Sequence, residues 1–194
     1  MNFYINLLLS VVFLFVAILF VARIFGYLFT YFFWGAIYVP TREDKVKKII
    51  EFLDIKPGQK IVDLGSGDGR LVIALAKAGA IAYGYEINPF LVARAKKSIL
   101  AAGLGDEAFV YCKNLWKQDL SCFDAVVVFG MKHMMKKLEL KVKSELKVGS
   151  KVVSNYFTFP TWVSDRAEEE VYLYVKNIDK EVKSDIFNVS QQDE

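Results

Sequence analysis

The chain has 194 residues with 25 Lys and Arg against 22 Asp and Glu, and Arg23 is the one charged residue among the first 41. The residues beyond 41 are enough for one domain with its own core, whereas the first 41 are too few for a second. That larger part carries 24 basic and 22 acidic side chains. It therefore lacks the basic excess that drives sequence-independent phosphate binding, and no nucleic-acid partner is expected.

The N-terminal stretch predicts a membrane span. From Met1 to Ala22 the polar side chains are Asn2, Asn6 and Ser10 alone, and about 20 apolar residues cross the hydrocarbon layer as a helix. A cleaved signal peptide is the competing interpretation, but it needs a basic start and a small-residue cleavage site. The next stretch, Ile24 to Val39, is rich in tyrosine and contains a tryptophan, so we expect it to lie along the membrane interface, with a second crossing as the alternative.

Basic residues follow this span and none precedes it. By the positive-inside tendency, a single-pass membrane protein of this kind has its soluble domain on the cytosolic or an equivalent side. The predicted division is 1–41 for the span and interfacial segment and 42–190 for the soluble domain. The basic residues are Arg23, Arg42, Lys45, Lys47 and Lys48.

Helical and strand patterns alternate along the soluble domain, which predicts an open, mainly parallel α/β sheet of seven strands with right-handed crossovers. An antiparallel pair closes it. We expect helices at Arg42–Asp54, Leu71–Ala78, Pro89–Ala102 and Met131–Leu146, and strands at Lys60–Leu64, Ile81–Tyr85, Ala108–Cys112, Asp124–Phe129, Ser150–Phe157, Glu170–Lys176 and Val182–Val189.

A glycine turn follows the first strand. Gly65, Gly67 and Gly69 alternate directly after Asp63, and glycines let the backbone approach a ligand closely. The dinucleotide fingerprint needs a glycine three residues after Gly67, where Arg70 stands, so a nicotinamide cofactor is disfavoured. Glu86 ends the next strand, where its carboxylate can accept hydrogen bonds from two ribose hydroxyls.

The sequence VDLGSGDG followed by YEIN resembles the first two motifs of class I S-adenosylmethionine-dependent methyltransferases, which have a Rossmann-like sheet. The resemblance implies an S-adenosyl-L-methionine cofactor. Asp63 and the turn of Gly65, Ser66, Gly67 and Gly69 would surround its methionine part, and Glu86 its ribose. Asn114 and Leu115 would contact its adenine, although many relatives have aspartate where Asn114 stands.

A narrower resemblance starts at Tyr38-Val39-Pro40, between the apolar segment and the methyltransferase domain. It is similar to the entry motif of membrane-anchored protein-lysine methyltransferases, whose human members act on mitochondrial inner-membrane proteins. Relatives often have proline before the tyrosine, where this chain has Ile37. The resemblance implies a lysine acceptor in a membrane or membrane-associated protein.

A lysine acceptor must be neutral when it attacks, which an apolar, aromatic-lined site promotes by lowering its pKa. We expect Tyr38 and Asn155 to act in catalysis, with Tyr38 contacting the amine. The competing interpretation of Tyr38 is an interfacial anchor. Tyr156, Phe157 and Trp162 are further candidates for lining the site, and core packing is an equal alternative for the last two.

Cys112 and Cys122 have no metal-ligand spacing and the chain has one histidine. We therefore expect no metal site and two thiols that pack in the interior. Two other functions stay open. One is methylation of a lipid or a lipophilic small molecule, and the other is a non-catalytic, membrane-tethered module that binds the cofactor.

Overall fold

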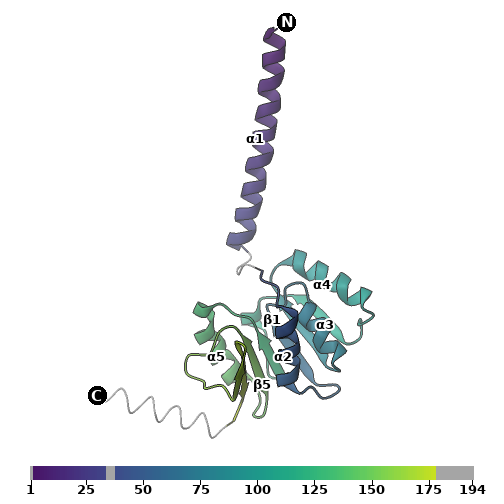
Figure 1. Ribbon diagram of the computed structural model, residues 1–194, viewed down its shortest axis with the longest axis vertical. Coiled ribbons are helices and arrows are strands. Elements are labelled where there is room, and N and C mark those ends of the chain that lie inside the picture. The colour runs from purple at the N-terminus through teal and green to yellow at the C-terminus, as the bar shows by residue number, and fades with distance from the viewer. Residues whose placement is uncertain (1, 34–37, 178–194) are drawn as a thin grey trace, which may run out of the picture. The chain divides into compact units, whose positions relative to one another are not determined.

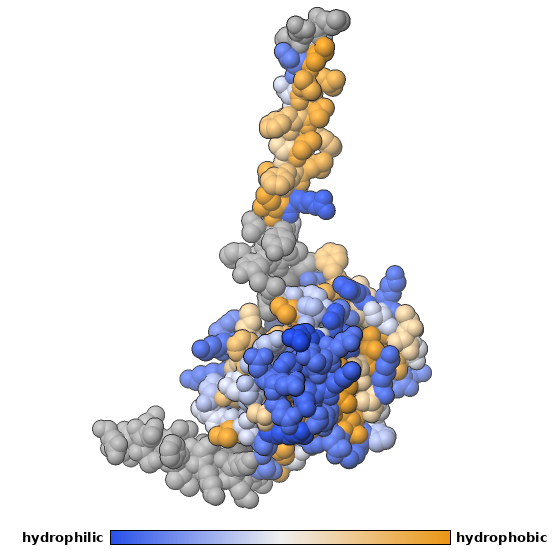
Figure 2. Space-filling view, viewed as in Figure 1, coloured by the Kyte–Doolittle hydropathy of each residue, from blue (hydrophilic) through white to orange (hydrophobic). Residues whose placement is uncertain are grey.

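The computed structural model describes residues 2–33 and 38–177, and the chain divides into two units, Met1–Ile37 and Tyr38–Glu194. The first unit is one helix, α1 (Asn2–Phe33). Its stretch Tyr4–Ile24 is the one helix in the described part of the chain that is long and apolar enough to cross a membrane. In the space-filling view, hydrophobic side chains dominate this helix, whereas the visible face of the second unit is largely hydrophilic (Figure 2).

Helix α1 continues past Ala22, the predicted end of the span, to Phe33. The first proline is Pro40, and Gly26 costs a helix only about 1 kcal/mol, so nothing stops the helix earlier. The predicted interfacial segment is therefore helical as far as Phe33. Its residues 34–37 lie outside the described part of the chain.

The second unit is a seven-stranded sheet in the order β3-β2-β1-β4-β5-β7-β6, with helices packed on it (Figure 1). The strands β1 to β5 are parallel, and β7 and β6 are antiparallel. The strands are β1 (Lys60–Leu64), β2 (Ile81–Glu86), β3 (Ala108–Cys112), β4 (Ala125–Val128), β5 (Lys151–Asn155), β6 (Arg166–Glu168) and β7 (Val171–Val175). The helices are α2 (Glu43–Leu53), α3 (Arg70–Lys77), α4 (Pro89–Ala101) and α5 (Met135–Glu145), with short 3-10 turns η1 (Leu115–Lys117) and η2 (Lys132–Met134).

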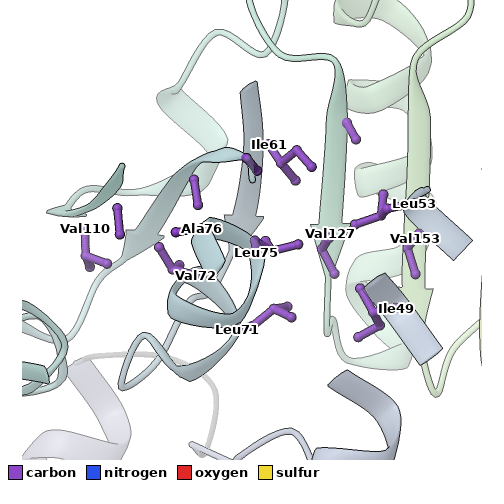
Figure 3. Close-up of a cluster of buried hydrophobic side chains, with 14 of the residues drawn as sticks. Ile49, Leu53, Ile61, Leu71, Val72, Leu75, Ala76, Val110, Val127 and Val153 are labelled. Atoms are coloured by element: carbon purple, nitrogen blue, oxygen red, sulfur yellow. The ribbon is translucent and has the colours of Figure 1, made fainter. Parts of the chain in front are cut away.

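Alternate residues of the central strands belong to two separate cores. Ile61 and Val127 pack with helices α2 and α3 (Figure 3) and also with α4, whereas Val62 and Val126 pack with helix α5. Successive side chains on a strand point to opposite faces, so the two cores lie on the two faces of the sheet. Strands buried on both faces explain the continuous apolar run of β4.

The final hairpin differs from the prediction. Strand β7 pairs with β5 on one side and with β6 on the other, and no strand was predicted at β6. Only three residues long, with Arg166 and Glu168 at its ends, β6 is a charged edge strand without an apolar pattern. The predicted last strand, Val182–Val189, lies outside the described residues.

Two further predictions need correction. The helix predicted from Met131 to Leu146 is the 3-10 turn η2 followed by α5. Cys112 and Cys122, predicted to pack in the interior, are free and exposed.

Candidate functional site

The carboxyl ends of β1, β2, β4 and β5 meet at one edge of the sheet, and strand order reverses between β1 and β4. Open α/β sheets bind ligands at such a switch point. The glycine turn between β1 and α3 lies there. Its Gly67 and Gly69 have φ angles of +54° and +79°, which residues with a Cβ rarely adopt. A Cβ on Gly69 would also fall 2.8 Å from Cβ of Ala95 in α4, so the turn needs glycine here.

The carboxylate of Glu86 connects the end of β2 to the glycine turn. Its Oε2 accepts a hydrogen bond from the backbone N–H of Gly67 at 2.9 Å, and its Oε1 accepts one from that of Asn88 at 2.8 Å. A carboxylate has about four acceptor positions. Glu86 can therefore hold the turn and still accept hydrogen bonds from a bound ligand.

Asp63 is a buried acid at the end of β1, with 5% of its surface exposed. Burial, and secondarily the nearby charge of Glu86, raise the pKa of its carboxyl to about 7. Among the described residues no cation pairs with it. An acid held in this state is suited to a positively charged ligand, which would favour its ionised form.

Two buried side chains in this region have polar atoms without partners in the described structure. They are the hydroxyl of Ser66 in the glycine turn and both amide atoms of Asn155, which ends β5 and is 1% exposed. A buried polar group without a partner costs free energy, so these atoms call for a partner that the described residues do not supply. Gly65 has open space where a Cβ would stand. The turn therefore fits a bound cofactor with polar groups.

Asn114 and Leu115 follow β3, whose last residue pairs with Glu86. The Asn114 side chain caps η1 by accepting a hydrogen bond from the N–H of Trp116 at 2.9 Å. Leu115 packs, partly buried, against the core beside α5. The two residues lie just after the carboxyl end of β3, as the sequence predicted. The side-chain oxygen of Asn114 already accepts the hydrogen bond of the cap.

Tyr38 lies directly against the glycine turn. A Cβ on Gly67 would fall 2.6 Å from Cε2 of the Tyr38 ring, and the hydroxyl is 3.4 Å from Nη2 of Arg70. Burial, followed by hydrogen bonding to Asp68, raises the pKa of the Tyr38 hydroxyl. The tyrosine of the entry motif is thus part of the same site as the turn.

Asp68 and Arg70, which both contact Tyr38, were not predicted as site residues from the sequence. Although burial opposes the ionisation of Asp68, hydrogen bonds from Arg70 and Tyr38 outweigh it and lower the pKa of its carboxyl. Both residues are in the GDGR end of the glycine motif. Nothing in the sequence spacing pairs them with Tyr38, which precedes them by about thirty residues.

The aromatic candidates separate into two groups. Trp162 is 8% exposed and packs in the core against Phe159 and Tyr174, and Phe157 packs against the same core. Tyr156, which follows Asn155, is 38% exposed and stacks on Phe129 with ring centroids 5.2 Å apart. Of these aromatics, the Tyr156 and Phe129 pair is the one that lies at the carboxyl ends of β5 and β4.

The fold and the glycine site define a class I methyltransferase, and comparisons with known proteins agree. Residues 63–166 match the family described as the ANTKMT methyltransferase domain. The chain belongs to this family. This confirms the predicted family, the S-adenosylmethionine-dependent methyltransferases, and its Rossmann-like sheet.

The similar proteins include curated enzymes and solved structures. A lysine N-methyltransferase of Rattus norvegicus that is named for an ATP synthase subunit is 40% identical over 133 residues, which cover 69% of this chain and 61% of that protein. The protein-lysine N-methyltransferase of Saccharolobus islandicus is 33% identical over 148 residues, covering 71% of this chain and 92% of that protein. An RNA methyltransferase structure from Salinibacter ruber, in complex with S-adenosyl-L-homocysteine, is 33% identical with a TM-score of 0.70 and covers 72% of this chain and 95% of that one. The chain spans 53–61% of the length of the rat enzyme and of its frog and mouse counterparts.

Proposed function

We propose that the protein uses S-adenosyl-L-methionine to methylate a lysine side chain of a membrane or membrane-associated protein. The similar proteins from rat and Saccharolobus islandicus are named lysine methyltransferases, which favours lysine as the acceptor. The observation that carries the proposal is the buried amide of Asn155, with neither polar atom partnered in the described structure. Such an amide is suited to hydrogen-bond a polar acceptor that enters the site.

The cofactor-binding residues in this proposal lie in the glycine turn and at the ends of β1, β2 and β3. Asp63 would face the positive charge of the cofactor's methionine part, and Glu86 would accept hydrogen bonds from its ribose. The full set is Asp63, Gly65, Ser66, Gly67, Gly69, Glu86, Asn114 and Leu115.

The bound cofactor would supply a methyl group carried by its sulfonium, and the neutral thioether S-adenosyl-L-homocysteine would be the leaving group. The protein therefore has to aim the acceptor amine and keep water away. Tyr38 and Asn155 are the catalytic residues that we propose. The Tyr38 hydroxyl and the Asn155 amide oxygen would accept hydrogen bonds from the amine N–H groups and so orient the nitrogen lone pair. The aromatic pair of Phe129 and Tyr156 favours the neutral amine by desolvating it.

Membrane attachment is part of the proposal, with α1 as a single span. The 21-residue stretch Tyr4–Ile24 is apolar and none of it is buried in the protein, so water is an unfavourable environment for it. Arg42, Lys47 and Lys48 follow the span, which by the positive-inside tendency puts the methyltransferase domain, residues 42–190, on the cytosolic or an equivalent side. An anchored enzyme has membrane proteins as its nearest substrates.

RNA is a second candidate acceptor, because the similar Salinibacter ruber structure is an RNA methyltransferase. A lipid or lipophilic small-molecule acceptor and a non-catalytic binding role are further candidates. One experiment separates them. The full chain in detergent is incubated with methyl-labelled S-adenosyl-L-methionine and native membranes plus total RNA, and the label is then measured in protein, RNA and the organic extract.

Label in protein that acid hydrolysis releases as methyllysine is the expected result. Label in RNA or in the organic extract alone would replace lysine with that acceptor. Cofactor binding by calorimetry without label in any fraction would support the non-catalytic role. The Asp63→Asn variant serves as the control for transfer that does not depend on the site.

A further inference from the structure

The Arg70 side chain connects the glycine turn to the backbone that leads into the methyltransferase domain. We call the segment Tyr38–Thr41 the entry strap. Nη2 of Arg70 is 3.4 Å from the Tyr38 hydroxyl, and Nη1 of Arg70 donates to the backbone carbonyl of Thr41 at 3.4 Å. The two ends of the strap are thus bound by the same guanidinium group.

Arg70 is itself held in place by Asp68. Nε of Arg70 is 3.1 Å from Oδ1 of Asp68, and Nη2 is 3.0 Å from Oδ2. This is the two-pronged arrangement in which the planar guanidinium matches a carboxylate, and it fixes the direction of the remaining N–H groups. Asp68 is 8% exposed, so the pair has a buried end that limits its motion.

We propose that Arg70, locked by Asp68, is a positioning residue that holds Tyr38 against the glycine turn for methyl transfer. The proposal rests on the proposed function, in which the Tyr38 hydroxyl orients the acceptor amine. Arg70 does not have to touch the cofactor or the acceptor. Its role is to keep the strap closed so that the Tyr38 ring stays against Gly67, where a Cβ would already be too close.

The state of the Tyr38 hydroxyl reports whether the strap is closed. The charged groups that face it are Asp68, Arg70 and Arg94, and its pKa is raised by burial first and by Asp68 second, while the two arginines lower it. If Arg70→Gln releases the strap, burial is lost and the pKa of Tyr38 falls toward its ordinary value. If Tyr38 stays in place without Arg70, only a positive charge is lost, and the pKa rises further.

Arg94→Gln is the matched control. Arg94 lies 3.8 Å from the same Asp68 carboxylate, with 64% of its side chain exposed, and in the described structure it makes no hydrogen bond to the strap. The same substitution there removes an equal charge without releasing Tyr38. We therefore expect the pKa of Tyr38 to fall in Arg70→Gln and to stay unchanged or rise in Arg94→Gln.

The first test is a pH titration of the full chain in detergent with tyrosine labelled at the ring carbon that bears the hydroxyl. The Tyr38 resonance is assigned by its loss in Tyr38→Phe. A lower pKa in Arg70→Gln, with an unchanged or higher one in Arg94→Gln, is the expected result. A higher pKa in both variants would overturn the proposal. This measurement needs no turnover, so it decides the role of Arg70 even if the lysine-transfer assay fails for the unmodified chain.

The second test measures transfer and cofactor binding separately. We expect Arg70→Gln to lower the turnover rate about tenfold or more, because misplacing an aligned group has effects of this size, and to change the cofactor Kd less than about threefold. In the Tyr38→Phe background, Arg70→Gln should have almost no further effect, because the two residues act as one unit. Additive losses, or a Kd that weakens as much as turnover falls, would contradict a role through Tyr38.

Discussion

The ring of Tyr38 lies against Gly67 so closely that a Cβ on the glycine would fall 2.6 Å from Cε2 of the ring. Gly67 also donates its N–H to Glu86. One glycine therefore connects the entry segment of the domain to the carboxylate that ends β2. Any side chain at this position has to displace the tyrosine, the turn or both.

We predict that Gly67→Ala abolishes most methyl transfer. The new methyl group pushes Tyr38 away, and the φ of +54° adds a strain of about 1–2 kcal/mol. The matched control is Gly58→Ala, where φ is +81° and no atom lies within 4 Å of the new Cβ. Thermal unfolding should show a loss of stability in both variants from the positive φ, and at least as large a loss in Gly67→Ala as in Gly58→Ala. Equal activity of the two variants in the labelled-methyl assay would show that the contact with Tyr38 has no role in transfer.

We predict that Asn155→Leu makes the protein more stable and less active. The substitution replaces two buried polar atoms without partners by apolar groups of similar size, which should raise the free energy of unfolding by about 1–3 kcal/mol. Turnover should fall because the acceptor loses its hydrogen bond. Urea unfolding and the transfer assay measure the two effects.

Asn88→Leu is the control for this substitution, because the Asn88 side chain caps α4 by accepting a hydrogen bond from the N–H of Phe90 at 3.0 Å. Removing the cap should lower stability by about 1 kcal/mol. A loss of stability in Asn155→Leu as well would mean that the Asn155 amide has a partner in the folded protein.

We predict that Asp63→Asn stabilises the cofactor-free protein in a pH-dependent way. The pKa of Asp63 in the folded state, about 7, exceeds its unfolded value of about 3.9, so the folded state binds more protons between these values. The stability contributed by Asp63 therefore falls as the pH rises from about 4 to about 7. Replacement by asparagine removes this loss, so above pH 7 it should raise the free energy of unfolding by at most about 4 kcal/mol. Urea unfolding at pH 4.5 and pH 8 measures it, and an equal effect at both values would contradict the raised pKa.

The same variant should bind S-adenosyl-L-methionine much more weakly, because the proposed site loses the charge that faces the cofactor. In the unmodified protein, cofactor affinity should fall as the pH drops below about 7, where Asp63 becomes protonated. Calorimetric titration at pH 6 and pH 8 checks this. A cofactor Kd that does not change between the two pH values would remove Asp63 from the site.

Local patterns predicted the parallel sheet well because each of its signals lies within a few residues. The limits of β1 and β3 match the predicted strands, and α4 begins at the predicted Pro89. In contrast, β6 has three residues, two of them charged, so it is too short to show the alternation of apolar and polar residues that predicts a strand. Strand β5 ends at Asn155, two residues before the predicted limit, because Tyr156 takes a left-handed φ of +70°.

The site was predictable in part for the same reason. The glycine turn was predicted from its motif, and Glu86 was predicted from its position at the end of a strand. The structure connects the two by a hydrogen bond. The contact of Arg70 with Tyr38 joins residues 32 positions apart, and no periodicity encodes it. The Asn155 amide is exceptional only through burial without a partner, which is a property of the packed fold.

We predict that Val12→Asp releases the protein from membranes. Val12 lies near the middle of the Tyr4–Ile24 stretch, where a buried charge opposes insertion by about 2.5–3.5 kcal/mol. Val163→Asp is the matched control, because Val163 is 80% exposed and belongs to the second unit. After expression, alkaline carbonate extraction should leave the unmodified chain and Val163→Asp in the membrane pellet and move Val12→Asp to the supernatant.

If all three stay in the supernatant, α1 does not anchor the protein. If all three stay in the pellet, the attachment does not depend on an apolar span, and the methyltransferase domain itself has to be tested for membrane binding.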